Sequence, residues 1–329
     1  MESHDSLNLP VPNNENERLK ALYYYDILDS EEEEQFNNLT ELIAEICQVP
    51  IALVSFLEEE RQWFKSKVGT DQTEAVRETS FCQYCIMEEK VMEVPDATKD
   101  KRFSNNPLVV NDPNLTFYAG YPLVDKDGFA IGTLCVYDVK PNKLNNSQLK
   151  ALEILSKEVM LAIESKKTIT QITQYKKFFN LAIDYLCIAN TDGFFKEVNP
   201  TFSEKLGYTN EEILSTKYMD FVHRKDKYRV LLEFHNLKKG HKIVDFQVRF
   251  KKKDKSFMWM YWSIQPDPMT GEIFATAHDI TIIKENEELL EKAKKYLSEN
   301  GSLGDTVDQN IKNLLDLKEK LDEDEFEVD

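Results

Sequence analysis

Apolar residues recur at steps of three and four between Phe36 and Ile46, and this spacing predicts an amphipathic helix over residues 31–47. Ser30 and Glu33 have the spacing of a capping box, in which each side chain bonds the other residue's backbone N–H. We therefore expect this helix to begin directly after Ser30.

Short apolar runs bounded by turn residues predict strands after this helix. In the first half of the chain they cover residues 51–56, 62–67, 117–123 and 130–137. A long stretch between them, 97–116, is rich in Asn, Asp and Pro, and irregular segments of this length inside a domain are commonly functional. A second helical pattern follows over 147–167. This order predicts an antiparallel sheet with helices packed to one side, the α+β class.

The second half of the chain has a similar mixture of strands and short helices. Its predicted strands cover residues 186–190, 194–198, 243–250, 258–265 and 272–279. Thr209 and Glu212 have capping-box spacing and predict the start of a short helix between these strands. We expect a second α+β domain.

A helical pattern over 281–299 follows the last strand. Ile283, Leu290 and Leu297 repeat every seven residues, as in the seam of a short coiled coil. We expect a parallel homodimer joined along this exit helix and along the helix between the domains, 147–175.

A chain of 329 residues is long enough for two domains. The predicted organisation is a disordered lead-in at 1–15, a first domain with its linking helix at 16–167, a second domain at 168–283, an exit helix at 284–299, and a short helix with an acidic tail at 300–329.

The formal net charge is -18, so the chain would repel nucleic acids and anionic membranes. The first 14 residues lack the basic and apolar regions of a signal peptide, and no apolar run reaches the roughly 20 residues of a membrane span. The five cysteines are scattered and odd in number, which does not indicate a disulfide framework. We expect a cytoplasmic protein that does not insert into membranes.

The first domain resembles the GAF domains of bacterial sensor kinases and cyclases. The resemblance rests on collinear runs that read VPIALVS at 49–55, RQWFK at 61–65, SFC at 80–82, VPDA at 94–97, RFSNNPLV at 102–109, FYAGYPL at 117–123 and IGTLCV at 131–136. The second domain resembles a PAS domain through NTDG at 190–193, VNP at 198–200, GY at 207–208, FVH at 221–223 and DIT at 279–281. Both resemblances imply a curved antiparallel sheet that encloses a pocket, with terminal helices that relay changes to an output.

In the GAF-like domain, Phe81, Cys82, Phe117 and Tyr118 are the candidate lining of a ligand pocket, although aromatic residues on strands are also ordinary core. Bilin attachment would need a cysteine that is often followed by histidine, and Cys82 is followed by glutamine. The sequence also lacks the NKFDE-type motif of cyclic-nucleotide binders. The resemblance therefore identifies no ligand.

Cys82 and Cys85 have CxxC spacing, which admits three interpretations. A zinc site would need two further ligands, and none is evident in this half of the chain, so we predict no metal. A redox pair would give a thiol oxidoreductase similar to methionine sulfoxide reductases, using Cys82, Cys85 or Cys135. The third interpretation is two small packing residues on one turn.

In the PAS-like domain the expected cofactor residues are missing. The stretch 215–221 holds no cysteine for a flavin adduct, and Arg229 stands where a heme-binding domain would place its axial histidine, with His223 and His235 displaced to either side. We expect a colourless protein without heme, flavin or bilin.

Asp279, Ile280 and Thr281 end the last strand and begin the exit helix. A carboxylate at a helix N-terminus is stabilised by the free backbone N–H groups and the helix dipole. In PAS families this residue also links the core to the outgoing helix. We expect Asp279 to couple the core to the helix, with simple capping as the alternative.

After Asp279 the sequence has neither a phosphoacceptor histidine nor a glycine-rich phosphate loop. We expect no catalytic output domain and no ATP or cyclic-nucleotide turnover. The expected function is signal sensing within a two-component system, through an unknown small molecule, dimerisation, or a partner such as a histidine kinase. The thiol oxidoreductase is the alternative, and the chain could also be the sensory part of a longer protein.

Overall fold

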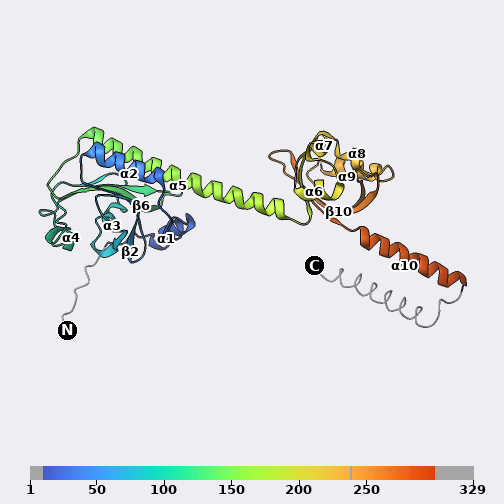
Figure 1. Ribbon diagram of the computed structural model, residues 1–329, viewed down its shortest axis with the longest axis horizontal. Helices are drawn as coiled ribbons and strands as arrows, with labels where there is room; N and C mark the ends of the chain where they lie inside the picture. The colour runs from blue at the N-terminus through green and yellow to red at the C-terminus, as the bar shows by residue number, and fades with distance from the viewer. Residues whose placement is uncertain (1–9, 238, 301–329) are drawn as a thin grey trace. The chain divides into compact units, whose positions relative to one another are not determined.

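The computed structural model describes residues 10–237 and 239–300. They form two compact units that divide between Thr173 and Gln174 (Figure 1). Beyond residue 300, the predicted short helix and acidic tail lie outside the described residues.

The first unit contains a six-stranded antiparallel sheet. In chain order its strands are β1 (Ile51–Leu57), β2 (Arg61–Val68), β3 (Glu74–Val76), β4 (Met92–Val94), β5 (Phe117–Val124) and β6 (Ala130–Asp138). Their order across the sheet is β3-β2-β1-β6-β5-β4. The four predicted strands are confirmed within two residues, whereas the three-residue edge strands β3 and β4 carry too little pattern to be predicted.

The helices of the first unit differ greatly in length. They are α1 (Glu15–Tyr24), α2 (Glu34–Cys47), the 3₁₀ turn η1 (Arg77–Thr79), α3 (Cys82–Cys85), α4 (Pro107–Val110) and α5 (Asn146–Leu181). Helix α5 continues 14 residues beyond the predicted end at 167. Most of its apolar residues there are exposed, so a search for a buried stripe underestimates its length.

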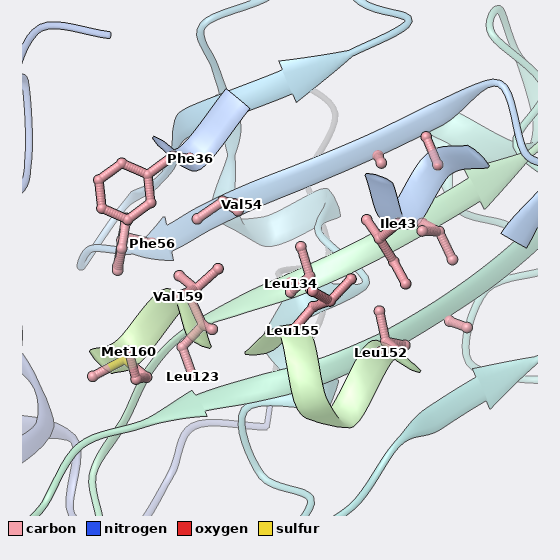
Figure 2. Close-up of a cluster of buried hydrophobic side chains, with 14 of the residues drawn as sticks. Phe36, Ile43, Val54, Phe56, Leu123, Leu134, Leu152, Leu155, Val159 and Met160 are labelled. Carbon is pink, nitrogen blue, oxygen red and sulfur yellow. The ribbon is translucent and has the colours of Figure 1, made fainter. Parts of the chain in front are cut away.

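Helices α2 and α5 cover one face of this sheet, as predicted (Figures 1 and 2). Val54 and Leu134 project from the sheet toward Ile43 of α2 and Leu152 of α5 in one buried cluster (Figure 2). A sheet that needed only this layer would alternate buried and exposed residues. Strand β6 instead buries seven successive residues, so the second face is covered as well.

The second face is covered by α3, α4 and the irregular chain around them. Successive side chains of a strand point to opposite faces, so Cys135 and Tyr137 of β6 lie on this side while Leu134 lies on the other. Phe103 from the irregular stretch stacks on Phe81 with ring centroids 4.2 Å apart. The prediction that helices pack on only one side of the sheet therefore missed this second buried layer.

Two local predictions differ from the structure. Residues 1–9 of the predicted lead-in lie outside the described residues, but the Pro10 carbonyl accepts a hydrogen bond from Gln83, and α1 begins at Glu15. The capping box at Ser30 is absent, because Glu33 is the N-cap of α2 without a side-chain cap. The Ser30 hydroxyl donates to the Ile27 carbonyl instead.

The second unit has a five-stranded antiparallel sheet in the order β8-β7-β11-β10-β9. Its strands are β7 (Tyr185–Asn190), β8 (Phe195–Val198), β9 (Ile243–Lys251), β10 (Phe257–Pro266) and β11 (Glu272–Asp279). Its helices are α6 (Pro200–Leu206), α7 (Asn210–Ser215), α8 (Tyr218–Phe221), α9 (Lys227–Leu237) and α10 (Thr281–Asn300). The Thr209–Glu212 capping box at α7 is confirmed.

This second sheet buries one face only. Along β11, Ile273, Ala275 and Ala277 are buried and the residues between them are exposed or half-buried. The buried side contacts residues of α6 to α9 in a single cluster. The predicted α+β class, with two antiparallel sheets and flanking helices, is confirmed for both units.

A buried lysine fastens α2 to the first sheet. Lys65 of β2 has a fully buried side chain, and its Nζ lies 2.6 Å from a carboxylate oxygen of Glu33 and 2.8 Å from the Ser30 hydroxyl. Glu33 also pairs with Lys166 of α5 at 2.7 Å. Burial raises the pKa of the Glu33 carboxyl, but its bonds to Lys166 and Lys65 outweigh this and lower the pKa.

Replacing Glu33 with Gln should lower the free energy of unfolding by roughly 1–3 kcal/mol at neutral pH, because Lys65 stays buried without its counter-charge. Because the Glu33 carboxyl has a lower pKa in the folded chain than in the unfolded chain, it stabilises the fold at pH values above its unfolded-state pKa. This stabilisation is lost as the pH falls through the folded-state pKa. The deficit of Glu33→Gln in urea unfolding should therefore shrink in acid. Glu32→Gln, at an exposed neighbouring position, is the control, and an equal deficit in both variants would contradict this account.

Candidate functional site

A cluster of buried polar side chains lies on the second face of the first sheet. It is centred on Cys82, the first residue of α3, whose backbone N–H donates to the Ser80 hydroxyl at 3.0 Å. The Ser80 hydroxyl donates to Gln62 of β2, and the Gln62 amide donates to the Ser55 hydroxyl at 2.7 Å. All residues of strand β1 other than Ser55 are apolar.

The Cys82 sulfur is surrounded by possible hydrogen-bond partners. It lies 3.5 Å from the Cys135 sulfur, 3.4 Å from the Tyr137 hydroxyl and 3.5 Å from the Tyr118 hydroxyl. The Gln62 amide nitrogen lies at 3.2 Å. The side chains of Cys82, Cys135 and Tyr118 are fully buried, so solvent does not compete for these contacts.

The backbone at Gly120 makes room for this arrangement. A Cβ atom there would lie 2.1 Å from the Tyr118 hydroxyl and 3.1 Å from the Cys85 sulfur. Any larger residue would push the tyrosine away from Cys82. The glycine of FYAGYPL therefore helps to position the Tyr118 hydroxyl against the thiol.

The two thiols of the closest pair have different acidities. Burial raises the pKa of a thiol, and at Cys135 it keeps the pKa well above its usual range. At Cys82 the hydrogen bonds outweigh burial and lower the pKa. The partners that do so are Cys135, Thr133, Tyr118 and Tyr137. Cys82 is therefore the more acidic thiol of the pair.

The four pocket residues predicted in this domain divide between the two faces of the sheet. Phe81, Cys82 and Tyr118 lie together on the second face. Phe117 lies in the cluster under α2 and α5, because adjacent strand residues point in opposite directions. Ser55, Gln62 and Tyr137 were not predicted, since polar residues in an apolar strand reveal a cluster only once the strands are paired.

The CxxC thiols do not form the closest pair. Cys82 instead lies near Cys135, which is 53 residues away in the sequence. Burial raises the pKa of the Cys85 thiol well above its usual range. A thiol reductase must admit its substrate to one of these sulfurs. Cys82, Cys85 and Cys135 are all completely buried, which does not favour the oxidoreductase alternative.

The second unit contains an apolar cavity of about 70 Å³, partly open to solvent, between its sheet and α9. Phe246 of β9, Trp262 of β10 and Ala275 of β11 contribute to the sheet side, and Glu233 and Phe234 contribute from α9. Among the described residues the Trp262 indole N–H is buried without a hydrogen-bond partner. A buried unpaired donor costs roughly 1–3 kcal/mol.

The histidines considered for heme binding do not line this cavity. His223 packs edge-on against Phe257, and its Nδ1 accepts a hydrogen bond from the Lys225 N–H. His235 lies exposed on α9. Arg229 places its guanidinium over the ring of Phe246, 5.3 Å from the centroid.

The junction between β11 and α10 is hydrogen-bonded to β10. An Asp279 carboxylate oxygen accepts from the Thr281 N–H at 2.9 Å, which caps the start of α10. The Thr281 hydroxyl accepts from the Trp259 N–H at 3.0 Å, and the Ile280 N–H donates to the Trp259 carbonyl at 3.0 Å. Asp279 therefore makes a local cap, while Thr281 and Ile280 connect the helix to the sheet.

The predicted dimer residues lie on α10. Ile283 is 55% exposed and Leu290 is half-buried, whereas the structure describes no side chain at Leu297. Exposed apolar residues also follow α5, among them Leu161, Ile172 and Tyr175. Within the described ranges, no helix combines the length and apolar character needed to cross a membrane.

Comparison with known proteins assigns a family to each unit. The sequence model of the GAF domain matches residues 31–163, and that of a PAS fold matches residues 195–273. The chain is 35% identical over 172 residues to a cyclic di-GMP phosphodiesterase of Pseudomonas aeruginosa. That match covers 52% of this chain and 29% of the phosphodiesterase.

The similar solved structures include sensory domains. One is a domain of a sensory box sensor histidine kinase/response regulator from Geobacter sulfurreducens, at 23% identity and a TM-score of 0.30, covering 33% of this chain and 94% of that one. Another is the PAS domain of an HTR-like protein from Haloarcula marismortui, at 23% identity and a TM-score of 0.31, covering 36% of this chain and 98% of that one.

The junction geometry makes the coupling prediction for Asp279 testable. Replacing Asp279 with Ala should cost about 1 kcal/mol and speed amide exchange over residues 281–296, with the amides of β9 and β10 unchanged. Thr281→Val should also speed exchange in α10, because it removes the hydroxyl that accepts from the Trp259 N–H while it keeps the Asp279 cap.

Asp267→Ala is the matched control, since Asp267 accepts from the Met269 N–H in a turn remote from α10. Hydrogen exchange read by mass spectrometry distinguishes the outcomes. Equal acceleration throughout the second unit would make Asp279 a stability residue and contradict a coupling role.

Proposed function

Since the chain carries a GAF domain followed by a PAS domain, we propose that it is a signal-sensing protein whose PAS cavity binds a small molecule. Its output would pass through the exit helix to a partner or a second copy of the chain. The observation that supports this most strongly is that Trp262 lines the apolar cavity and that its indole N–H is buried without a hydrogen-bond partner among the described residues.

The cavity wall indicates the chemistry of the ligand. Apart from Glu233, the side chains around Trp262 are largely aliphatic and aromatic. A mostly apolar molecule with one hydrogen-bond acceptor would satisfy the indole N–H and fill space that water occupies poorly. The volume of about 70 Å³ is smaller than the roughly 150 Å³ of an engineered cavity that binds benzene, so the ligand is small or α9 moves to admit it.

Strand β10 offers a route from the cavity to the exit helix. Trp262 lines the cavity, and Trp259, three residues earlier on the same strand, is hydrogen-bonded to Thr281 and Ile280 at the start of α10. A shift of β10 when the cavity fills would therefore reach the helix directly.

Exposed and half-buried apolar residues on α5 and α10 support the homodimer. Ile283 and Leu290 on α10, and Ile172 on α5, would be covered by the same positions of a second copy in a parallel pair. A histidine kinase or another signalling protein is the alternative partner of these helices.

The phosphodiesterase named among the relatives is matched over 29% of its length, which does not extend its activity to this chain. We propose sensing without catalysis, in the cytoplasm, because both matched families are sensory and the thiols of Cys82, Cys85 and Cys135 are closed to substrates.

The ligand proposal predicts a difference between two probes of similar shape. Cyclohexanone has a carbonyl acceptor and cyclohexane has none, so cyclohexanone should raise the midpoint of thermal unfolding more at equal concentration. A ligand at 100 times its Kd stabilises by about 2.7 kcal/mol. Trp262→Phe should abolish the difference, and Ala275→Leu should fill the cavity and abolish both shifts.

Trp259→Phe is the control on the same strand, because Trp259 does not line the cavity. Calorimetry of the full chain provides the measurement. Equal shifts for the two probes in the unmodified chain, or a cyclohexanone advantage that persists in Trp262→Phe, would refute the assigned role of the indole.

The dimer proposal predicts that a charge in the seam separates the subunits. Leu290→Glu should lower the molar mass measured by light scattering at tens of micromolar from that of a dimer toward half, because two carboxylates would meet in the apolar seam. Lys292→Glu, two residues away and exposed, should leave the mass unchanged. A monomer mass for the unmodified chain would also refute the dimer.

A further inference from the structure

Two thiols from distant parts of the GAF domain meet in its core. Cys82 lies at the start of α3, and Cys135 lies on β6 between β1 and β5. Their sulfur atoms are 3.5 Å apart, about 1.5 Å more than a disulfide bond, so a change of side-chain rotamer could join them. The described residues show Cys85, Cys47 and Cys187 in no comparable contact with another sulfur.

We propose that Cys82 and Cys135 are a peroxide-reactive pair that forms a reversible disulfide bond inside the GAF domain. The proposal is independent of the PAS cavity, because it concerns the other unit of the chain. It names hydrogen peroxide or a small organic hydroperoxide as the oxidant.

The surroundings of Cys82 suit it to react first. The Tyr118 and Tyr137 hydroxyls and the Gln62 amide can all donate hydrogen bonds to a sulfur anion. These contacts favour the thiolate, which is the nucleophilic form of cysteine. The lowered pKa of Cys82 and the raised pKa of Cys135 agree with this order of reaction.

The chemistry balances with one peroxide for each disulfide. The Cys82 thiolate attacks one peroxide oxygen, the O–O bond breaks, and hydroxide leaves and takes up the Cys82 proton as water. The resulting sulfenic acid is attacked by the Cys135 sulfur, so the S–S bond forms as the S–O bond breaks. That hydroxide takes the Cys135 proton, and two electrons have passed from the two thiols to the peroxide. An external thiol reverses the step by exchange.

A small oxidant can reach the pair through the layer that covers it. This layer is built from the four-residue helices α3 and α4, the turn η1 and the irregular stretch 97–116. Short elements of this kind open locally at lower free energy than a sheet does. Hydrogen peroxide is close to water in size, whereas a methionine sulfoxide substrate would need a much larger opening.

The bond would alter two connections of the domain. It would tie α3 to β6, the strand that leads into α5. It would also pull on Gln83, which follows Cys82 and bonds both the Pro10 carbonyl and the Arg77 guanidinium. Oxidation would therefore alter the contacts of the N-terminal segment and of the start of the linking helix α5.

Thiol counting on the full chain tests the proposal. The reduced protein has five thiols, and brief treatment with hydrogen peroxide followed by N-ethylmaleimide in denaturant should leave three of them labelled. Before labelling, the intact mass should fall by about 2 Da, the two hydrogens lost to the disulfide. Peptide mapping without reductant should recover a cross-link between the peptides of Cys82 and Cys135, and dithiothreitol should restore five labels.

Three cysteine variants sharpen the result. Cys187→Ser, in the other unit, and Cys85→Ser should still lose two labels on oxidation. Cys135→Ser should not lose a pair of labels to a disulfide bond, and oxidation should leave a sulfenic acid on Cys82 that dimedone traps. Five labels after oxidation of the unmodified folded chain, or a cross-link from Cys82 to Cys85, would overturn the proposal. The peptide map of the unmodified chain decides the matter even if a variant fails to fold.

Discussion

A polar side chain that is buried in a protein core has to find its hydrogen-bond partners inside that core, and this constraint shapes the second face of the GAF sheet. Ser55, Gln62 and Ser80 satisfy one another there and leave the Gln62 amide directed at the Cys82 sulfur. The short helix α3 and the irregular stretch 97–116 are needed to keep water out. The cluster and its cover therefore depend on each other, which explains why an antiparallel sheet is buried on both faces.

The PAS domain meets the same constraint differently. Its cavity wall leaves the Trp262 N–H without a partner, whereas the backbone of Trp259 on the same strand is fully engaged at the α10 junction. On the same strand, the backbone of Trp259 is thus bonded to the exit helix, and three residues further on the indole N–H of the cavity-lining Trp262 lacks a partner. A ligand that accepts a hydrogen bond from the indole would satisfy this donor, and the hydrogen-bonded strand β10 would transmit the effect to α10.

The sequence was a good guide to elements and a poor guide to their contacts. Strands β1, β5 and β6 follow from their apolar runs and β2 from the charged turn before it, and the capping box at Thr209 was predicted because it involves residues only three apart. The meeting of Cys82 with Cys135 depends on strand register and on a loop that folds back over the sheet, neither of which has a local signal. Phe117 was grouped with Tyr118 in one candidate pocket lining, whereas adjacent residues of β5 point to opposite faces of the sheet. Ser30 was a misleading signal, since its hydroxyl is used by the Ile27 carbonyl and by Lys65.

The central claim is that filling the PAS cavity changes the start of α10 through β10. Hydrogen exchange of the full chain, with and without saturating cyclohexanone, tests it most directly because it reports both places at once. The account predicts slower exchange at the amides of β10 near Trp262 and, in the same sample, altered exchange over residues 281–296. Protection confined to the cavity strands, with the amides of α10 unchanged, would contradict it.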